Sequence, residues 1–153
     1  MVYILGLLMG VVGGLRAMTA AAAVSWAAYL SVIGTAGTWL SFLGSFWTVL
    51  ILSVLAIGEF ITDQLPSTPS RTVPVQFGAR LVSGALCGAA FGMAGGSAIG
   101  GVLAGIVGAA IGTLGGARLR AGLAAAFGRD RPAGFIEDML AIAGAILIVA
   151  VWR

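Results

Sequence analysis

The sequence contains no histidine and no lysine, and Cys87 is its only cysteine. These absences exclude, within one chain, zinc sites of histidine and cysteine, histidine-based triads, Schiff-base lysines and a disulfide. Because no pair of nucleophile and base is visible, we expect the protein not to be an enzyme and to hold no cofactor or metal. Charged residues are also scarce, at 8% of the 153 residues, while 60% are hydrophobic. Since soluble domains carry about 25% charged residues, this composition predicts a membrane protein.

Long uncharged segments indicate where the chain crosses the bilayer. A crossing helix needs roughly 20 apolar residues, because a helix rises about 1.5 Å per residue and the hydrocarbon core is about 30 Å thick. Residues 40–58 are uncharged and rich in large apolar side chains, which predicts the clearest span. The uncharged run 81–117 is too long for one crossing and is expected to turn at 93–97, where Gly95 and Gly96 favour leaving the helix. The further predicted spans are 75–92, 98–117 and 135–152.

The first 33 residues are ambiguous, because Arg16 interrupts an apolar stretch. One long helix would bury a lone charge. A cleavable signal peptide fits poorly, because no basic region precedes the apolar run. The third alternative is two short segments, 2–14 and 19–33, with Arg16 at a turn or at a re-entrant break. The sequence therefore predicts an all-α fold, a polytopic transmembrane helix bundle of about five to six membrane segments whose N-terminal helix is short or broken.

The arginines suggest how this bundle is oriented. Most lie in the predicted loops 63–74 and 118–131 or at Arg16, and the positive-inside rule would place all three regions on the cytoplasmic side. Three segments on each side of the Pro-rich loop also suggest a 3+3 inverted repeat. We expect one integral membrane domain, 1–153, with halves 1–65 and 74–153 joined by the loop 66–74. The arginines interpreted as topology signals are Arg118, Arg120, Arg129 and Arg131.

Glycines recur at helical spacing in the two spans that follow the Pro-rich loop. Such rows place small residues on one helix face, where backbones can approach closely in lipid. They indicate tight packing within the chain or between copies, or a groove left open by the missing side chains. As partners we expect membrane lipids and a second copy of the chain, bound through these glycine faces. The glycines concerned are Gly84, Gly88, Gly92, Gly101, Gly105, Gly108 and Gly112.

Charged and polar residues gather at two helix ends that one loop joins. Glu59 and Asp63 lie four residues apart at the end of one span, and Gln76 and Arg80 share a polar stripe at the start of the next. We expect Arg80 to meet Glu59 or Asp63 at similar depth, where pairing lowers the cost of burial. Two interpretations stay open. The pair is structural, or the carboxylates bind a small cation or proton with Arg80 and Arg16 as counter-charges.

Two further segments carry candidate residues. The loop 66–74 holds three prolines and four hydroxyl groups around Arg71, and it cannot be helical throughout. It is a stiff connector, or a functional loop that gates the bundle or holds a lipid phosphate. Glu137 and Asp138 begin the last span, where they complement the helix dipole or complete a charged site with Arg16 or Arg118. The candidate loop residues are Ser67, Thr68, Ser70, Arg71 and Thr72.

Several of these motifs together resemble a known family. The most specific one is Pro-Ser-Thr-Pro-Ser-Arg-Thr at 66–72 with Ala79-Arg80 behind it, and Gly-Leu-Arg-Ala-Met-Thr-Ala at 14–20 and Glu137-Asp138 accompany it. The combination spans most of the chain and is similar to domain-of-unknown-function family 4126, a group of small bacterial membrane proteins. The family pattern has Lys where Gln64 stands and a Pro within the alanine run that follows Thr19. The resemblance implies an all-helical integral membrane protein and supplies no reaction.

These observations lead to one functional hypothesis and two alternatives. Intramembrane charges, broken helices and polar stripes favour a transporter or channel-like protein for a small ion or polar solute, in the bacterial inner membrane. The alternatives are a structural or assembly subunit of a membrane complex and a protein that handles lipid headgroups. Nucleic-acid binding is not expected, because membrane topology accounts for the arginines.

Overall fold

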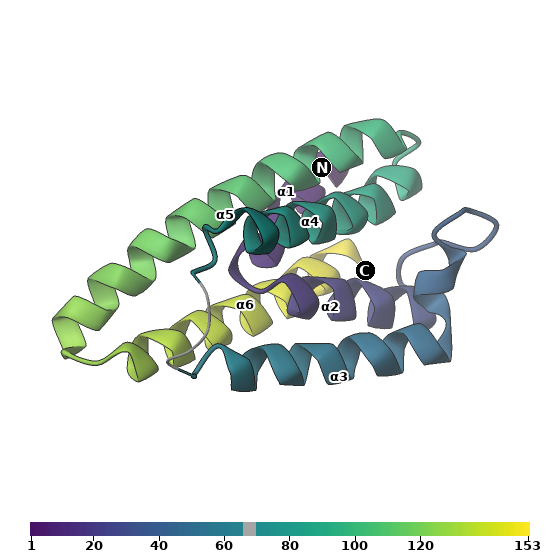
Figure 1. Ribbon diagram of the computed structural model, residues 1–153. Coiled ribbons are helices and arrows are strands. Elements are labelled where there is room, and N and C mark those ends of the chain that lie inside the picture. The colour runs from purple at the N-terminus through teal and green to yellow at the C-terminus, as the bar shows by residue number, and fades with distance from the viewer. Residues whose placement is uncertain (66–69) are drawn as a thin grey trace.

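The computed structural model describes residues 1–65 and 70–153, and the regular elements in these ranges are all helical. Figure 1 shows the helices gathered into one bundle. The all-α class predicted from the sequence is therefore confirmed. The elements are α1 (Val2–Leu15), α2 (Ala17–Tyr29), the short 3₁₀ helix η1 (Ser41–Gly44), α3 (Phe46–Thr62), α4 (Pro74–Ala94), α5 (Ala98–Phe127) and α6 (Asp130–Trp152).

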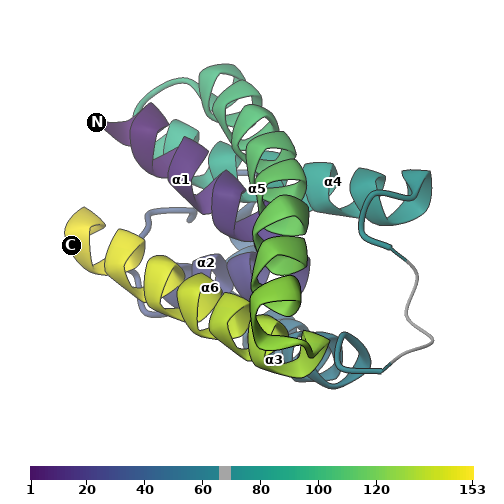
Figure 2. The same cartoon turned by 90° about the vertical axis from the view of Figure 1, so that its left-hand side faces the viewer.

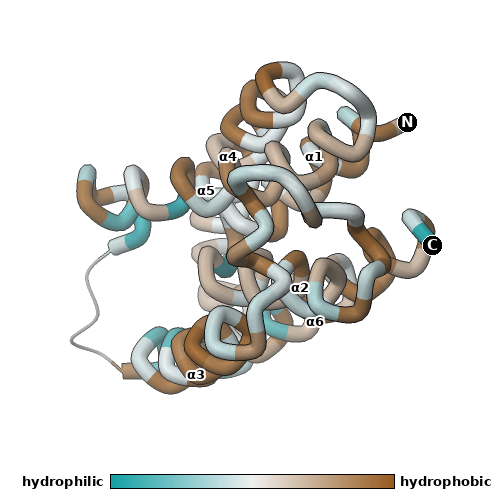
Figure 3. Tube along the Cα trace, turned by 90° about the vertical axis from the view of Figure 1, so that its right-hand side faces the viewer, coloured by the Kyte–Doolittle hydropathy of each residue, from teal (hydrophilic) through white to brown (hydrophobic). Residues whose placement is uncertain are grey.

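Three helices, α4, α5 and α6, are long and apolar enough to cross a bilayer. Helices α1 and α3 are apolar but shorter, with 14 and 17 residues. Large hydrophobic side chains such as Trp47, Ile99 and Leu147 face outward, and Figure 3 shows hydrophobic positions predominating along α3. An exterior of this kind marks a surface that contacts lipid or protein. The long apolar helices indicate a membrane protein, while the number of crossings stays a prediction.

One predicted turn is present and sharply defined. Helix α4 ends at Ala94 and α5 begins at Ala98, within the segment where the sequence predicted a reversal. Gly96 adopts φ +86°, a conformation that side-chain-bearing residues rarely take. Ser97 then caps α5, because its hydroxyl oxygen accepts a hydrogen bond from the Gly100 amide at 3.3 Å. The reversal thus follows from the local sequence.

Three predicted boundaries are wrong. The span predicted at 40–58 starts later, because residues 41–44 form η1 and α3 begins only at Phe46. The predicted loop 118–131 is mostly helical, since α5 continues to Phe127 and α6 begins at Asp130 rather than near residue 135. Hydropathy falls after residue 117, but the alanines, leucines and arginines that follow are strong helix formers. Helix propensity, rather than hydropathy, sets the length of α5.

Helices α1, α4 and α5 pack backbone against backbone through their glycines. A Cβ added at Gly88 would overlap the carbonyl oxygen of Gly101, one at Gly105 would overlap that of Gly84, and one at Gly108 would overlap a carbonyl of α1. The seven glycines predicted to join copies of the chain are all buried within one copy. Of the two kinds of packing that the sequence left open, the structure shows the one within the chain, and a homo-oligomer stays a prediction. Close packing within the chain uses these glycines.

The ends of the helices divide the molecule into two sides. Figure 2 views the molecule from the end at which α5 meets α6, and both chain termini lie on one flank of that view. Figure 1 places the segment between α2 and α3 at the opposite end of the bundle from the α5–α6 connection. Because Trp152 donates its indole N–H to the Val32 carbonyl at 3.0 Å, the end of α6 lies beside the α2–α3 segment. The charged residues gather toward the other side.

Candidate functional site

The N-terminal apolar stretch is two helices that meet at Arg16. The backbone of Arg16 is extended, with φ −142° and ψ 101°, and it separates α1 from α2. Gly13 and Gly14 precede the break and lower the helix propensity there. The break leaves carbonyls at the end of α1 and amides at the start of α2 without helical partners, and such groups need partners when buried. This structure corresponds to the alternative of two short segments.

Arg80 and Glu59 supply those partners. The Arg80 guanidinium donates from Nη1 to the carbonyls of Gly14 at 2.9 Å and Leu15 at 2.6 Å, at the end of α1. The Glu59 carboxylate accepts hydrogen bonds from the first two amides of α2, both at 3.0 Å. Each charge complements the helix dipole at its end of the break. Arg80 Nη2 also lies 3.9 Å from Glu59 Oε1, so the structure brings this predicted pair together.

Two hydroxyl groups complete the support of the break. Ser83 on α4 donates to the carbonyl of Ala17 at 2.6 Å, and the Thr113 hydroxyl on α5 lies 3.2 Å from the carbonyl of Gly14 and 2.8 Å from that of Ala109, between which it shares its hydrogen. Both hydroxyl groups are buried, so each replaces a hydrogen bond that water would otherwise make. Side chains from α3, α4 and α5 therefore satisfy the broken backbone, and the geometry around Glu59 and Arg80 is that of paired helix caps.

Arg16 itself carries a charge into the interior. Its side chain has no exposed surface and lies over the Phe60 ring, with Cζ 5.8 Å from the ring centroid. The guanidinium forms ion pairs with Asp63, just after α3, and with Asp138 on α6. A buried charge is tolerated when it is paired in this way, whereas a lone one is costly. Arg16 thus joins the helix break to two other elements.

Asp63 is the centre of a larger group of charges. Besides Arg16, its Oδ2 atom lies 3.0 Å from Arg120 Nη1 and 3.8 Å from Arg71 Nη2. Arg71 also binds Glu137 through both guanidinium nitrogens, and Arg120 Nη1 lies 3.6 Å from Glu137 Oε2. We call these groups, with Asp130 and Asp138, the arginine–carboxylate network. Its members are Arg16, Arg71, Arg120, Asp63, Asp130, Glu137 and Asp138.

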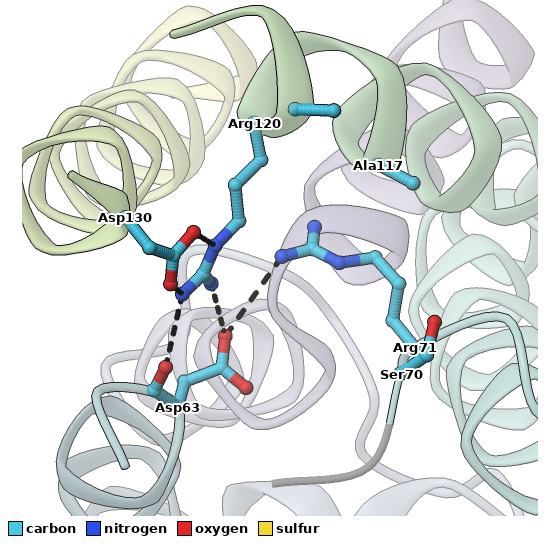
Figure 4. Close-up of a pocket in the computed structure, with 7 residues that line it drawn as sticks. Asp63, Ser70, Arg71, Ala117, Arg120 and Asp130 are labelled. Atoms are coloured by element: carbon cyan, nitrogen blue, oxygen red, sulfur yellow. Dashed lines mark hydrogen bonds and ion pairs between the residues drawn. The ribbon is translucent and has the colours of Figure 1, made fainter. Parts of the chain in front are cut away.

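A cavity of about 280 Å³ opens onto this network. Figure 4 shows Arg120 between Asp63 and Asp130, with Arg71 approaching Asp63 from the other side. Arg120 forms a fork on Asp130, with Nε 2.9 Å from Oδ1 and Nη2 2.5 Å from Oδ2. Asp63, Ser70, Arg71, Arg120 and Asp130 line the cavity together with two alanines of α5. The cavity reaches the rim of the network, and its lining does not include Glu59 or Arg80.

The network carries one more negative charge than positive charges. Its three arginines face four carboxylates, which leaves one negative charge when all seven groups are ionised. Glu59 and Arg80 beside it cancel each other. The excess belongs to Asp130, whose side chain is 61% exposed, because the three arginines balance the three buried carboxylates. A carboxylate at the rim of a cavity is a place where a proton or small cation can bind, because either would neutralise its charge. Within residues 1–65 and 70–153, no group of three or more histidine, cysteine or acidic residues is placed to hold a metal ion.

Some predicted site residues lie at the network's edge or apart from it. Gln76 is half-buried near the start of α4, and no polar contact joins it to the network in the described residues. Ser70 and Thr72 are exposed and lie 2.8 Å apart, oxygen to oxygen. Ser67 and Thr68 lie outside the described residues. Arg118 is exposed on α5 and makes no ion pair in the part of the chain that the structure describes.

Sequence reasoning missed two members of the network, Arg120 and Asp130. Both were assigned to a loop, and Arg120 was interpreted as a topology signal. A signal was nonetheless present. The glycine row on α5 advances by three or four residues to Gly112 and Gly116, and the next step of four is Arg120. Arg120 therefore lies on the face of α5 that packs inward, which helix periodicity would have shown.

Comparison with known proteins gives no relative. No protein-family model, no curated protein and no solved structure matches the chain. The resemblance to domain-of-unknown-function family 4126 therefore stays a prediction.

Proposed function

We propose that this protein is a small transporter or channel-like protein of the bacterial inner membrane that moves a small ion or polar solute. The observation that carries the proposal is the arginine–carboxylate network, a largely buried set of charges that opens onto a cavity, with Asp130 as an excess carboxylate at the exposed rim. Burying so many charges among apolar helices is expensive. Proteins that bear this cost within a membrane commonly use the charges on a substrate or ion pathway.

The proposal assigns the charged residues to two tasks. Asp63 receives the ion or solute, because it lines the cavity and faces three arginines. Arg71 and Arg120 are its counter-charges, and a bound cation would compete with them for the carboxylate. Glu59 and Arg80 hold the helix break in place, because their hydrogen bonds go to backbone groups at its two ends. Broken helices whose ends face a site are a recurring plan in secondary transporters.

The loop around Arg71 fits the role of a gate that closes on the cavity. Arg71 turns inward from the loop and binds Glu137 on α6 with two nitrogens. A bidentate pair of this kind fixes the orientation of the guanidinium. Because Glu137 already holds Arg71, the alternative in which Arg71 binds a lipid phosphate receives less support. An assembly role would show as a partner that co-purifies in a fixed ratio in mild detergent.

Flux into proteoliposomes tests the proposal. The purified protein is reconstituted, and movement of H⁺, Na⁺, K⁺, Cl⁻ and small polar metabolites is followed for the wild type, Asp63→Asn and Asp130→Asn. We expect the wild type to move at least one of them, and Asp63→Asn to lose about tenfold or more of that rate because a charged hydrogen-bonding partner is lost. Asp130→Asn, at the exposed rim of the same cavity, should lose less.

Arg118→Gln provides the control, because Arg118 is exposed on the same helix as Arg120. This variant should keep the wild-type rate. Each variant is first compared with the wild type by size-exclusion profile and thermal unfolding in detergent, so that a folding defect is not mistaken for lost transport. A folded wild type that moves nothing across the whole panel would overturn the proposal.

A further inference from the structure

Helices α2 and α6 run side by side in the same direction from the network to the other side of the molecule. At one end Arg16 pairs with Asp138, and at the other end Trp152 donates to the carbonyl of Val32 at 3.0 Å. The two contacts hold these helices together at both ends of a common interface. We call the facing sides of residues 16–32 and 138–153 the α2–α6 seam.

The far half of this seam is hollow. A cavity of about 450 Å³ lies between the two helices there. It is distinct from the cavity at Asp63, since the two have no lining residue in common. The side chains that line it are mostly small or apolar, and Arg153 is its charged member. Its wall includes Ala23, Ala27 and Leu30 of α2, and Ala145, Val149 and Arg153 of α6.

Helical spacing connects this cavity to the network. On α2, Thr19, Ala23 and Ala27 follow one another at steps of four, so they share one face. On α6, Asp138 lies seven residues before Ala145, which is two helical turns or about 10 Å along the same face. Along α6, therefore, two helical turns lie between the network, at Asp138, and the cavity, at Ala145.

Thr19 lies one helical turn before Ala23 on α2, between the network and the cavity, and its hydroxyl group makes no hydrogen bond in the described residues. The residue is only 8% exposed, and the Thr19 Oγ1 atom is buried without a hydrogen-bond partner in the described residues. Most buried hydroxyl groups bond to a carbonyl or to water, and an unpaired one costs free energy. Valine would fill the same space without that cost. A threonine here therefore indicates a polar ligand that visits the seam.

We propose that the α2–α6 seam is the route past the helix break for a single positive charge, a proton or an alkali-metal ion, with Asp138 and Thr19 as its inner binding site. The inference rests on the proposed transport function and specifies its solute class and its path. A carboxylate and a hydroxyl oxygen are the ligands that hard monovalent cations and protons share. The Asp138 carboxylate would attract such a cation, in competition with Arg16, and would repel an anion.

Thr19→Val is the sharpest test, because a structural role and a transport role predict opposite results. A structural role predicts unchanged flux and equal or higher thermal stability, since an unpaired buried hydroxyl is replaced by a methyl group. The proposal predicts that cation flux into proteoliposomes falls by about tenfold while the protein stays folded. Thr48→Val on α3, outside the seam, should leave flux unchanged. Separate arms with a pH-sensitive dye, Na⁺ and K⁺ distinguish the proton from the metal ions.

Thiol labelling gives a second measurement that does not depend on the rate of transport. Cys87, the natural cysteine, is fully buried, so we expect the wild-type protein to show little reaction with the thiol reagent. We expect Ala23→Cys, in the wall of the seam cavity, to react with a charged, water-borne methanethiosulfonate and to lose flux as it reacts. Ala143→Cys, which lies on α6 outside the seam and lines a different, apolar hollow, should not react.

The outcomes separate this inference from the proposed function. If the wild type moves a cation, and Thr19→Val and labelled Ala23→Cys both move it at the wild-type rate, the seam is not the route and the transport function stands. If the solute that moves is an anion or a neutral molecule, the inference fails in the same way. If the folded wild type moves nothing, both proposals fail.

Discussion

At the scale of single residues, the main feature is that every acidic side chain of the protein has an arginine partner. The five acidic residues pair with four of the eight arginines. Because lysine and histidine are absent, the positive partners keep their charge at all ordinary pH values. Arginine also offers several donors in a fixed plane, which lets Arg16 pair with two acidic residues and Arg120 with three. Proton uptake, if the site performs it, therefore belongs to the carboxylates.

A first prediction compares a buried pair with an exposed one. Glu137 is 1% exposed and binds Arg71 with both carboxylate oxygens. Glu137→Gln leaves the guanidinium of Arg71 buried without its main counter-charge, and should destabilise the folded protein by about 3 kcal/mol. Asp130→Asn also removes an arginine partner, but the Asp130 side chain is 61% exposed and the expected loss is below about 1 kcal/mol.

Thermal unfolding in detergent measures both variants. We expect a clear fall in Tm for Glu137→Gln and a small one for Asp130→Asn. Equal melting temperatures for Glu137→Gln and the wild type would show that Arg71 finds another partner, and the assignment of this pair as a structural anchor of the loop would be wrong.

At the scale of helices, close backbone approach is what packs the bundle. In lipid, apolar side chains gain little by leaving the membrane for a helix interface, so association depends on how closely the backbones fit. Helix α5 meets both α4 and α1 through its glycines, and the carbonyls of the facing helices lie where side chains would otherwise stand. Helices α4 and α5 also hold the broken N-terminal stretch, of which α1 is the first half. Its support therefore depends on the glycine contacts as well as on the charged caps.

A second prediction compares two glycines on α5. At Gly105 a Cβ would overlap the carbonyl oxygen of Gly84, so Gly105→Ala must push α4 and α5 apart. We expect a loss of about 2 kcal/mol or more, as for other overpacked interiors. At Gly115 a Cβ would meet nothing within 4 Å, and Gly115→Ala should be neutral or gain up to about 1 kcal/mol through helix propensity.

The two alanine variants are measured side by side by thermal unfolding in detergent, with intrinsic tryptophan fluorescence as the signal. A melting temperature for Gly105→Ala that equals or exceeds that of Gly115→Ala would contradict the packing described for α4 and α5. Because the two substitutions are chemically identical, the difference between them reports the contact alone.

At the scale of the whole molecule, charge is distributed unevenly between its two sides. The arginine–carboxylate network and the α5–α6 connection with Arg129 lie toward one side, and the segment 30–45 and both termini lie toward the other (Figures 1 and 2). Arg153 lies toward that second side, in the wall of the seam cavity with Leu30 and Val32. From the positive-inside rule we predict that the side with the α5–α6 connection faces the cytoplasm.

A third prediction follows for labelling from one side of the membrane. Gly34→Cys lies in the exposed α2–α3 segment, and Arg129→Cys lies at the exposed α5–α6 connection. With an impermeant thiol reagent added to intact cells whose outer membrane is permeabilised, we expect Gly34→Cys to react and Arg129→Cys to react only after lysis. Reaction of both from the same side would contradict the two-sided arrangement, and a reversed pattern would contradict the orientation alone.

The apolar segments could be predicted from the sequence, because the bilayer sets a simple requirement of length and hydropathy. The reversal at Gly95 and Gly96 could be predicted too, because it depends on local backbone freedom. The start of α3 and the extent of α5 could not, since hydropathy does not report where a helix ends. Arg120 and Asp130 were missed for that reason.

The sequence by itself determined that the protein is all-helical, apolar and short of charge, and that its few charges must find one another. Chain composition and spacing suffice for this, because lipid leaves buried charges and unpaired backbone groups no other stable partner. Which partners they find depends on the packing of the helices. Glu59 and Arg80 bind the two sides of the break between α1 and α2. Asp63 lies within ion-pair distance of three arginines, and the glycine rows pack helices of one chain together. These choices depend on how six helices meet in space, which no local pattern specifies.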